Sequence, residues 1–136
     1  MNVTVSHVQG RVPVALLHID GDLDASSYRD LIARGQEVYD AGSRNVLLDL
    51  SNMPYMSSSG LVALHRIALL LRGEKPSDPE SGWEAFRAID RDRDSGLQQR
   101  VKLLNPQPQV DKALETVGFK QFFEVHTDLA TAIASF

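Results

Sequence analysis

The chain has 136 residues, of which 43% are hydrophobic, with a net charge of −4 and no cysteine. This length suits one domain, which can bury roughly two-thirds of its unfolded surface without cross-links. The absence of cysteine excludes disulfides, thiol catalysis and cysteine-based zinc sites, and it fits a reducing cytoplasm. An acidic chain without a run of lysine and arginine is a poor nucleic-acid binder, so we expect protein partners.

No membrane segment or secretion signal is predicted. The first ten residues lack the basic start and apolar core of a signal peptide. The longest apolar run, around Leu61–Leu71, is too short to span a bilayer. We therefore expect a cytoplasmic protein without membrane insertion.

The N-terminal part of the chain predicts two strands followed by a helix. Residues 2–8 alternate apolar and polar side chains, which is typical of a half-buried edge strand. A denser apolar strand is predicted over 12–20, with Pro13 near its start, where the missing N–H does least harm. A serine then opens a helix over 26–41, which Gly42 ends.

A central strand and a buried helix come next. Residues 45–51 form a continuous apolar run, which predicts a strand covered on both faces. The loop MPYMSSSG, residues 53–60, leads into a helix over 61–73. Apolar side chains cover most of the circumference of this helix, so it should be buried or in contact with a partner.

Residues 74–100 differ in composition from the rest of the chain. They are rich in proline, serine, glycine and charge, and a structureless loop of this length is uncommon inside a compact domain. The segment is therefore either disordered or a functional insertion. Trp83, Phe86 and Ile89 recur at three-residue spacing, which would allow a short amphipathic helix. If ordered, we expect these aromatic residues to cover the end of the sheet in preference to binding a partner.

No metal or other cofactor is predicted. Asp90, Asp92 and Asp94 alternate as in a calcium loop, but the glycine and the final acidic residue of such a loop are misplaced. The four histidines lie on separate elements and show no ligand spacing.

The C-terminal part alternates strands and helices again. It predicts a strand over 101–106, a helix from Pro108 to Gly118, a strand over 121–127 and a last helix over 128–136. The complete order predicts an α/β domain. We expect a mixed-direction central sheet of about four to five strands, packed with about four helices.

Three serines and Gly60 stand where the buried helix begins. The first N–H groups of a helix lack partners and the dipole there is positive, so the site suits an anion, including a phosphate on its own serine. The alternative is capping, which is worth about 1 kcal/mol over alanine but needs only one serine. A hydrolase nucleophile is a third interpretation, although no G-x-S-x-G elbow is present. We expect Gly60 to keep the backbone approachable from outside.

Two motifs resemble the STAS domains of bacterial anti-sigma factor antagonists. VLLDLSNMPYMSSSGLVAL, residues 46–64, is similar to the family signature of an apolar strand, D-L/F-S, an acidic residue and S-S/T/A-G-L. HIDGDLDASS, residues 18–27, resembles the family's G-E-L-D element, and residues 101–133 resemble its C-terminal half. The resemblance implies a single STAS domain over residues 1–136, with an insertion at about 74–100.

The resemblance also implies a phosphorylation site. In such proteins an anti-sigma factor with a histidine-kinase-like ATP-binding fold acts as a serine kinase and phosphorylates the serine directly before the glycine. Ser59 holds this position here, with Ser58 as the second choice. The acidic residue two positions earlier is replaced by Ser57, which removes a negative charge beside the acceptor. Asp22 and Asp24 match the acidic residues of the G-E-L-D element.

The implied function is a switch in transcription regulation and not an enzyme. The unphosphorylated protein would bind the anti-sigma factor and the phosphorylated protein would release it, with a PP2C-type phosphatase as a further partner. A homodimer is also compatible with the sequence. The alternative is a non-phosphorylated STAS scaffold subunit of a signalling or transport assembly, which Ser57 and the insertion favour. The expected partner-binding residues are Asp22, Asp24, Tyr55, Ser57, Ser58 and His65.

Overall fold

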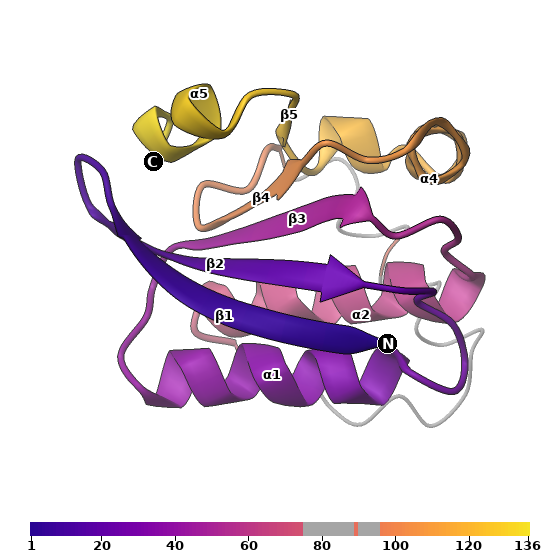
Figure 1. The fold of residues 1–136 in the computed structure, drawn as a ribbon, viewed down its shortest axis with the longest axis horizontal. Coiled ribbons are helices and arrows are strands. Elements are labelled where there is room, and N and C mark those ends of the chain that lie inside the picture. Colours follow the sequence, from indigo (N-terminus) through magenta and orange to yellow (C-terminus); the bar gives the residue numbers. More distant parts are fainter. Residues whose placement is uncertain (75–88, 90–95) are drawn as a thin grey trace.

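The computed structural model describes residues 1–74, 89 and 96–136, and the elements follow the predicted order (Figure 1). The elements are β1 (Asn2–Gln9), β2 (Pro13–Asp20), α1 (Tyr28–Asp40), β3 (Val46–Asn52), α2 (Ser58–Leu71), β4 (Val101–Leu104), α4 (Pro108–Thr116), the 3₁₀ helix η2 (Phe119–Gln121), β5 (Val125–His126) and α5 (Leu129–Ala134). Trp83, Phe86 and the aspartates of the calcium-like run lie outside the described residues.

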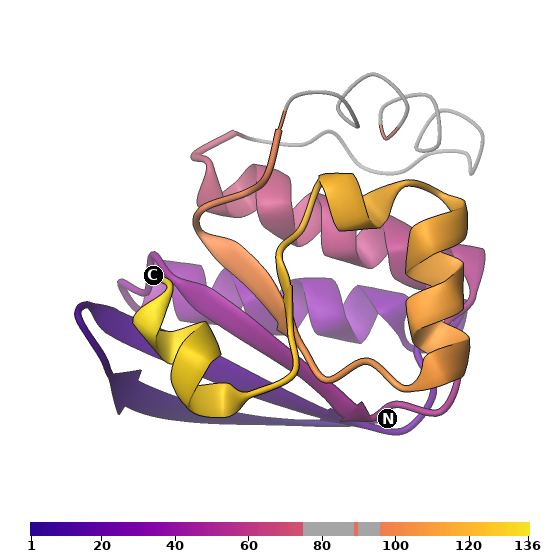
Figure 2. The same cartoon turned by 90° about the horizontal axis from the view of Figure 1, so that it is seen from above.

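The five strands form one mixed sheet in the order β1-β2-β3-β4-β5. The first two strands pair antiparallel, and every later pair is parallel. Helices α1 and α2 lie on one face of the sheet, and α5 crosses the other face (Figure 2). This confirms the predicted mixed α/β sheet, and it places the carboxyl ends of β2 and β3 at the same edge.

The main core lies between the sheet and the two long helices. Leu17, Leu48 and Leu103 point from three neighbouring strands toward this side, where they join Leu31 of α1 and Ile67 of α2. All five side chains are fully buried. Because apolar side chains cover most of α2, its inner surface can contact both the sheet and α1.

A smaller core lies on the opposite face of the sheet, under α5. Its buried members are Val14, Leu47, Leu104, Ala132 and Ile133. Neighbouring residues of a strand point to opposite faces, so β3 contributes to both cores. This confirms the prediction that the continuous apolar run is a central strand covered on both sides.

The last strand is shorter than predicted. Only Val125 and His126 pair with β4, whereas the expected strand covered 121–127. Phe122 and Phe123 are fully buried and pack with Phe119, with ring centroids 4.8 to 5.9 Å apart. The chain coils through the 3₁₀ helix η2 just before this point, and this places all three aromatic rings in one buried cluster, whereas a strand would turn Phe122 and Phe123 to opposite faces.

The described residues were also searched for membrane-spanning helices and for metal-binding clusters. No helix in the described part of the chain is long and apolar enough to cross a membrane. The same residues contain no cluster of three or more histidine or acidic side chains that could hold a metal ion.

Candidate functional site

Two loops meet at the edge where β2 and β3 end. The N–H of Leu23 donates to the carbonyl of Tyr55 at 3.0 Å, and the N–H of Ser57 donates to the carbonyl of Leu23 at 2.9 Å. These bonds form an isolated parallel bridge between Leu23 and Met56, whose side chains are buried. The G-D-L-D element and the serine loop are therefore one hydrogen-bonded unit, which we call the loop pair (residues 21–27 and 53–60).

Ser57 occupies the N-cap position of α2, but its side chain does not cap the helix. Its φ and ψ are −85° and 176°, and its carbonyl accepts bonds from the N–H groups of Gly60 and Leu61. The Ser57 hydroxyl is buried and has no hydrogen-bond partner. The interpretation of the serines as side-chain caps is therefore wrong for the residue at the cap position.

The next two serines lie on the first turn of α2 and remain accessible. Ser58 is exposed and Ser59 is partly exposed. Neither hydroxyl nor backbone N–H of the two residues has a hydrogen-bond partner among the described residues. The start of the helix thus presents free donors and two free hydroxyls at the surface.

Gly60 has a different role from the one expected. It is buried, and a Cβ added to it would lie 2.6 Å from Met56 Cγ and 3.0 Å from both Leu23 Cγ and Leu23 O. The glycine therefore lets α2 begin in direct contact with the loop pair. The expectation that it keeps the backbone approachable from outside is wrong, because the side where a side chain would stand is already filled.

The carboxylate of Asp24 is held inside its own loop. It accepts bonds from the hydroxyl of Ser26 at 2.6 Å and from the N–H of Ser26 at 2.9 Å, and the Ser27 hydroxyl lies 3.3 Å away. The hydrogen bonds from Ser26 lower the pKa of Asp24, and those from Ser27 lower it further. Burial raises the pKa by less, so the net pKa lies below its usual value. Asp24 is therefore a fixed negative charge that shapes the loop before α1.

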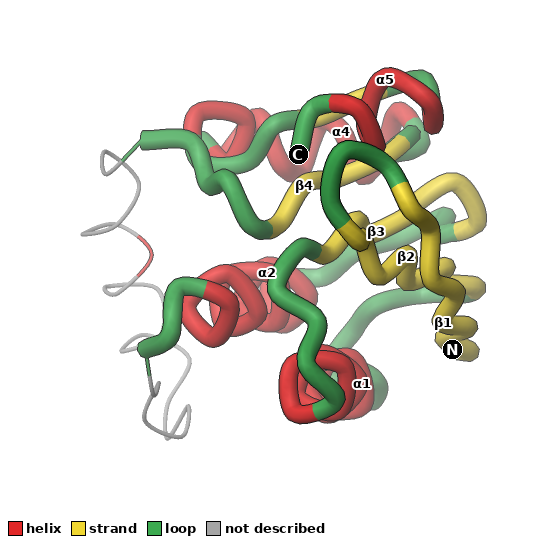
Figure 3. Tube along the Cα trace, turned by 90° about the vertical axis from the view of Figure 1, so that its left-hand side faces the viewer, coloured by secondary structure: helices red, strands yellow, loops and turns green. Residues whose placement is uncertain are grey.

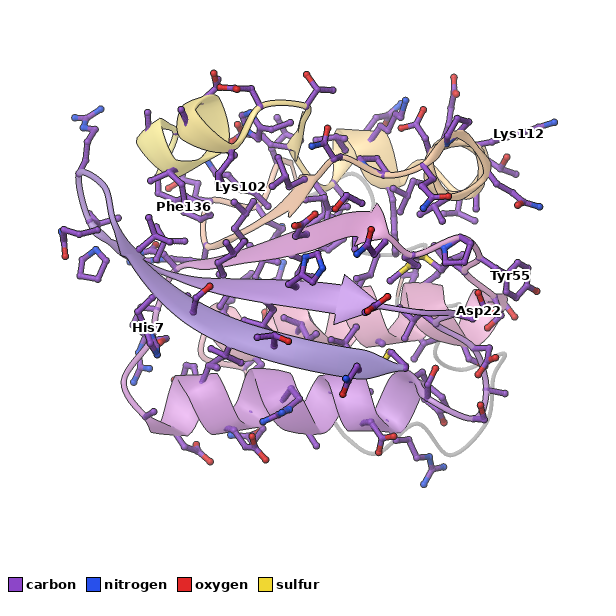
Figure 4. All side chains as sticks on the ribbon, viewed as in Figure 1. His7, Asp22, Tyr55, Lys102, Lys112 and Phe136 are labelled. Atoms are coloured by element: carbon purple, nitrogen blue, oxygen red, sulfur yellow. The ribbon has the colours of Figure 1, made fainter. Side chains whose placement is uncertain are left out.

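Asp22 and Tyr55 project from the loop pair toward solvent. Asp22 is exposed, and Tyr55 is 46% exposed, although it is a large hydrophobic side chain. Figure 4 shows the two residues at the same end of the molecule. The structure thus brings together Asp22, Asp24, Tyr55, Ser57, Ser58 and Ser59, which the sequence places in two separate segments.

His65 is not part of this surface. It is 3% exposed, and its ring lies 5.7 Å from the ring of Phe122 between centroids. A side chain buried this deeply cannot contact a docking protein, so the expectation that His65 binds a partner is withdrawn. The position follows from the almost entirely apolar helix, in which His65 lies on a face turned into the core.

Sequence reasoning missed a side-chain interaction that joins β3 to β2. Asp49 Oδ2 lies 2.8 Å from His18 Nδ1, and Asp49 Oδ1 accepts the N–H of Ser51 at 3.0 Å. Burial raises the pKa of Asp49, but the bonds from Ser51 and His18 outweigh it, so the net pKa lies below the usual value. The only sequence signal was that Asp49 begins the D-L-S motif.

Comparison with known structures identifies the fold. A proposed anti-sigma factor antagonist from Thermotoga maritima superposes with a TM-score of 0.65 at 14% identity, covering 96% of this chain and 90% of its own. An anti-sigma factor antagonist from Mycobacterium paratuberculosis gives 0.63 at 14% identity, covering 97% and 94%. The unphosphorylated antagonist SpoIIAA gives 0.60 at 17% identity, covering 97% and 93%. These similarities define a protein of the STAS fold class.

The family is defined by sequence. The family described as "Mlab, STAS domain" matches residues 6–77, which is more than half of the chain. The protein therefore belongs to the MlaB STAS domain family. No curated protein sequence matches the chain.

Proposed function

We propose that the protein is an anti-sigma factor antagonist, a phosphorylation-controlled switch that acts by binding another protein in the bacterial cytoplasm. The partner is a serine-kinase-type anti-sigma factor with a histidine-kinase-like ATP-binding fold, and a PP2C-type phosphatase reverses the modification. Ser59 is the acceptor, with Ser58 as the second choice. The docking surface is the loop pair, including Asp22, Asp24, Tyr55, Ser57 and Ser58.

One observation carries the proposal. Ser59 stands partly exposed on the first turn of α2, without a hydrogen-bond partner in the described structure, beside a loop that carries two aspartates. A kinase can reach such a hydroxyl without unfolding the helix. Structural similarity to SpoIIAA, which is known in an unphosphorylated and a phosphorylated form, supports the same interpretation.

The switch follows from electrostatics. A phosphate adds about −1.5 to −2 charges at neutral pH. The unpaired N–H groups of Ser58 and Ser59 and the helix dipole stabilise this charge in the free protein. In a complex the same charge would have to lose water near Asp22 and Asp24, which repel it. Phosphorylation is therefore expected to leave the fold intact and to release the partner.

The acceptor is tested with purified protein. The chain is incubated with ATP and, one at a time, each histidine-kinase-like serine kinase encoded in the source genome, and its intact mass is measured. We expect one phosphate on the wild type and on Ser58→Ala, and none on Ser59→Ala. A phosphate that persists in Ser59→Ala but disappears in Ser58→Ala would move the acceptor to Ser58.

The release step needs a second measurement. Affinity for the kinase that modifies the chain is compared between wild type, Ser59→Asp and Ser59→Ala by calorimetry without ATP. We expect the aspartate to weaken binding at least about tenfold, and the alanine to bind like the wild type, because only the aspartate adds charge. Equal affinities for all three would contradict the switch.

A second candidate function is a scaffold subunit of a signalling or transport assembly that is not phosphorylated. Ser57 stands where the antagonist signature has an acidic residue, and the matching family is that of MlaB. In this case no kinase modifies the chain. In size-exclusion chromatography, the Ser59→Ala variant would then still elute as part of the assembly. The Tyr55→Ala variant, which lacks the exposed ring of the loop pair, would elute apart from it.

A further inference from the structure

An open hollow of about 560 Å³ lies at the end of the molecule opposite the loop pair. Three arginines from separate segments line it: Arg44 after α1, Arg72 at the end of α2 and Arg100 just before β4. Figure 3 looks onto this end of the molecule, where both long helices finish. No acidic residue is among the described residues that line the hollow.

Arg44 is held in a fixed orientation. Its Nη1 donates to the carbonyls of Tyr39 at 2.8 Å and Ser43 at 2.9 Å, and its guanidinium carbon lies 3.9 Å from the centroid of the Tyr39 ring. These contacts use one of the three guanidinium nitrogens. The other two, Nε and Nη2, have no partner in the part of the chain that the structure describes, so they can bind a ligand with little further loss of entropy.

Arg100 and Arg72 complete the charge of the hollow. Within the described residues, the guanidinium of Arg100 makes one long hydrogen bond, 3.5 Å from Nη1 to Asn45 Oδ1. Arg72 is paired with Glu74, with 2.6 Å between Nε and Oε2. After this pair is counted, Arg44 and Arg100 remain as two positive charges that no described acid balances, in a chain of net charge −4.

The hollow also has an apolar side. Leu97 is 52% exposed, which is high for a leucine, and the Tyr39 ring and the buried Leu71 lie around the same space. A ligand that fits both features carries at least two negative charges together with an apolar side chain. The acidic surface elsewhere disfavours a long polyanion such as nucleic acid, since it would be repelled outside the hollow.

We propose that this hollow binds an acidic peptide segment of a partner protein. Carboxylates of the segment pair with Arg44 and Arg100, whose planar guanidinium groups can donate two parallel hydrogen bonds each. An apolar side chain of the segment packs on Leu97 and Tyr39. The 14 residues of α2 separate this hollow from Ser59 by about 20 Å, so the proposal does not depend on the phosphorylation switch.

The test uses the full chain and a fluorescein-labelled hexapeptide that alternates glutamate with leucine, followed by fluorescence anisotropy. We expect saturable binding that Arg100→Gln weakens about fivefold and that the double variant Arg44→Gln with Arg100→Gln weakens further. Lys112→Gln removes the same charge from α4, away from the hollow (Figure 4), and should bind like the wild type. Because the Arg100 side chain makes only one long hydrogen bond within the described residues and its backbone is unchanged in the variant, Arg100→Gln is expected to fold normally.

Four outcomes would overturn the proposal. Equal affinities of wild type and Arg100→Gln would show that the peptide binds elsewhere. Equal weakening by Lys112→Gln would show non-specific charge attraction. Equal binding of a peptide with serine in place of leucine, or displacement by an equal concentration of inorganic phosphate, would make the hollow a general anion site without preference for a peptide.

Discussion

Leu23 and Ser57 are joined by a backbone hydrogen bond of 2.9 Å, in which the Ser57 N–H donates to the Leu23 carbonyl. The bond connects two loops through residues that are 34 positions apart in the sequence. It sets the direction in which α2 leaves the sheet, and therefore where Ser58 and Ser59 meet solvent.

Gly60→Ala should destabilise the protein. The new Cβ would stand 2.6 Å from Met56 Cγ and 3.0 Å from the backbone oxygen of Leu23, so the start of α2 has to move away from the loop pair. Overpacking of this kind costs about 1–3 kcal/mol of unfolding free energy, measured by urea denaturation. Ser58→Ala, on the exposed side of the same turn, is the control and should change stability by less than about 0.5 kcal/mol. A stable Gly60→Ala variant would contradict the tight contact.

Ser57→Ala distinguishes capping from an unsatisfied hydroxyl. A serine that caps a helix through its side chain loses about 1 kcal/mol of stability on replacement by alanine. The Ser57 hydroxyl is buried without a hydrogen-bond partner, so its removal should instead stabilise the fold by about 1 kcal/mol. Thermal and urea unfolding of the two proteins give the sign directly. A destabilised variant would show that the hydroxyl caps α2 after all.

Asp24 should make stability depend on pH in the acid range. Its pKa in the folded protein lies below the ordinary value of 3.8, because it accepts hydrogen bonds from Ser26 and Ser27. As pH falls, the carboxylate of Asp24 is therefore protonated first in the unfolded chain. The stabilisation by the ionised carboxylate is complete above about pH 5, and it is lost as pH falls through the pKa of the folded state. Unfolding free energies measured between pH 7 and pH 2 should fall less steeply for Asp24→Asn than for the wild type.

The control for this prediction is Asp22→Asn, which removes a carboxylate from the same loop. Asp22 is exposed, and its carboxylate accepts no hydrogen bond within the described residues. Its replacement is expected to be a surface change that alters the unfolding free energy at pH 7 by less than about 0.5 kcal/mol. Parallel curves for Asp24→Asn and the wild type would contradict the role assigned to the Asp24 hydrogen bonds.

Lys102 should hold α5 on the sheet. Its side chain is 4% exposed, and Nζ donates to the carbonyl of Ser135 at 2.8 Å and pairs with Glu124 at 3.1 Å. It also lies 4.8 Å from the ring of Phe136 (Figure 4). Lys102→Ala leaves Glu124 with His126 Nε2, at 3.2 Å, in place of the lysine, and it removes the bond that anchors α5. We therefore expect a loss of about 2 kcal/mol of unfolding free energy.

Hydrogen exchange shows which part of the protein Lys102→Ala destabilises. The amides of α5 should exchange faster in Lys102→Ala, while those of α1 keep their relative protection. Lys120→Ala removes a solvent-exposed pair with Asp111 and should lower the unfolding free energy far less than Lys102→Ala does. A Lys102→Ala variant as stable as Lys120→Ala would show that the buried lysine does not anchor the helix.

The order and ends of most elements could be predicted from local sequence. Gly42 and Gly118 follow α1 and α4 with φ of 106° and 78°, which glycine adopts without strain. The apolar run of β3 indicated a strand with two covered faces, and the structure shows one. Such signals are local, because strand alternation, helix ends and turns depend on residues within a few positions of each other.

The surroundings of each side chain were decided by the tertiary structure. Gly60 contacts Leu23, His65 contacts Phe122, and neither partner is near in sequence. The arginine hollow has the same origin, since α1, α2 and the start of β4 bring Arg44, Arg72 and Arg100 together from segments that show no basic cluster. Strand order and helix packing bring together residues that are far apart in the chain, so local pattern revealed the serines but not what surrounds them.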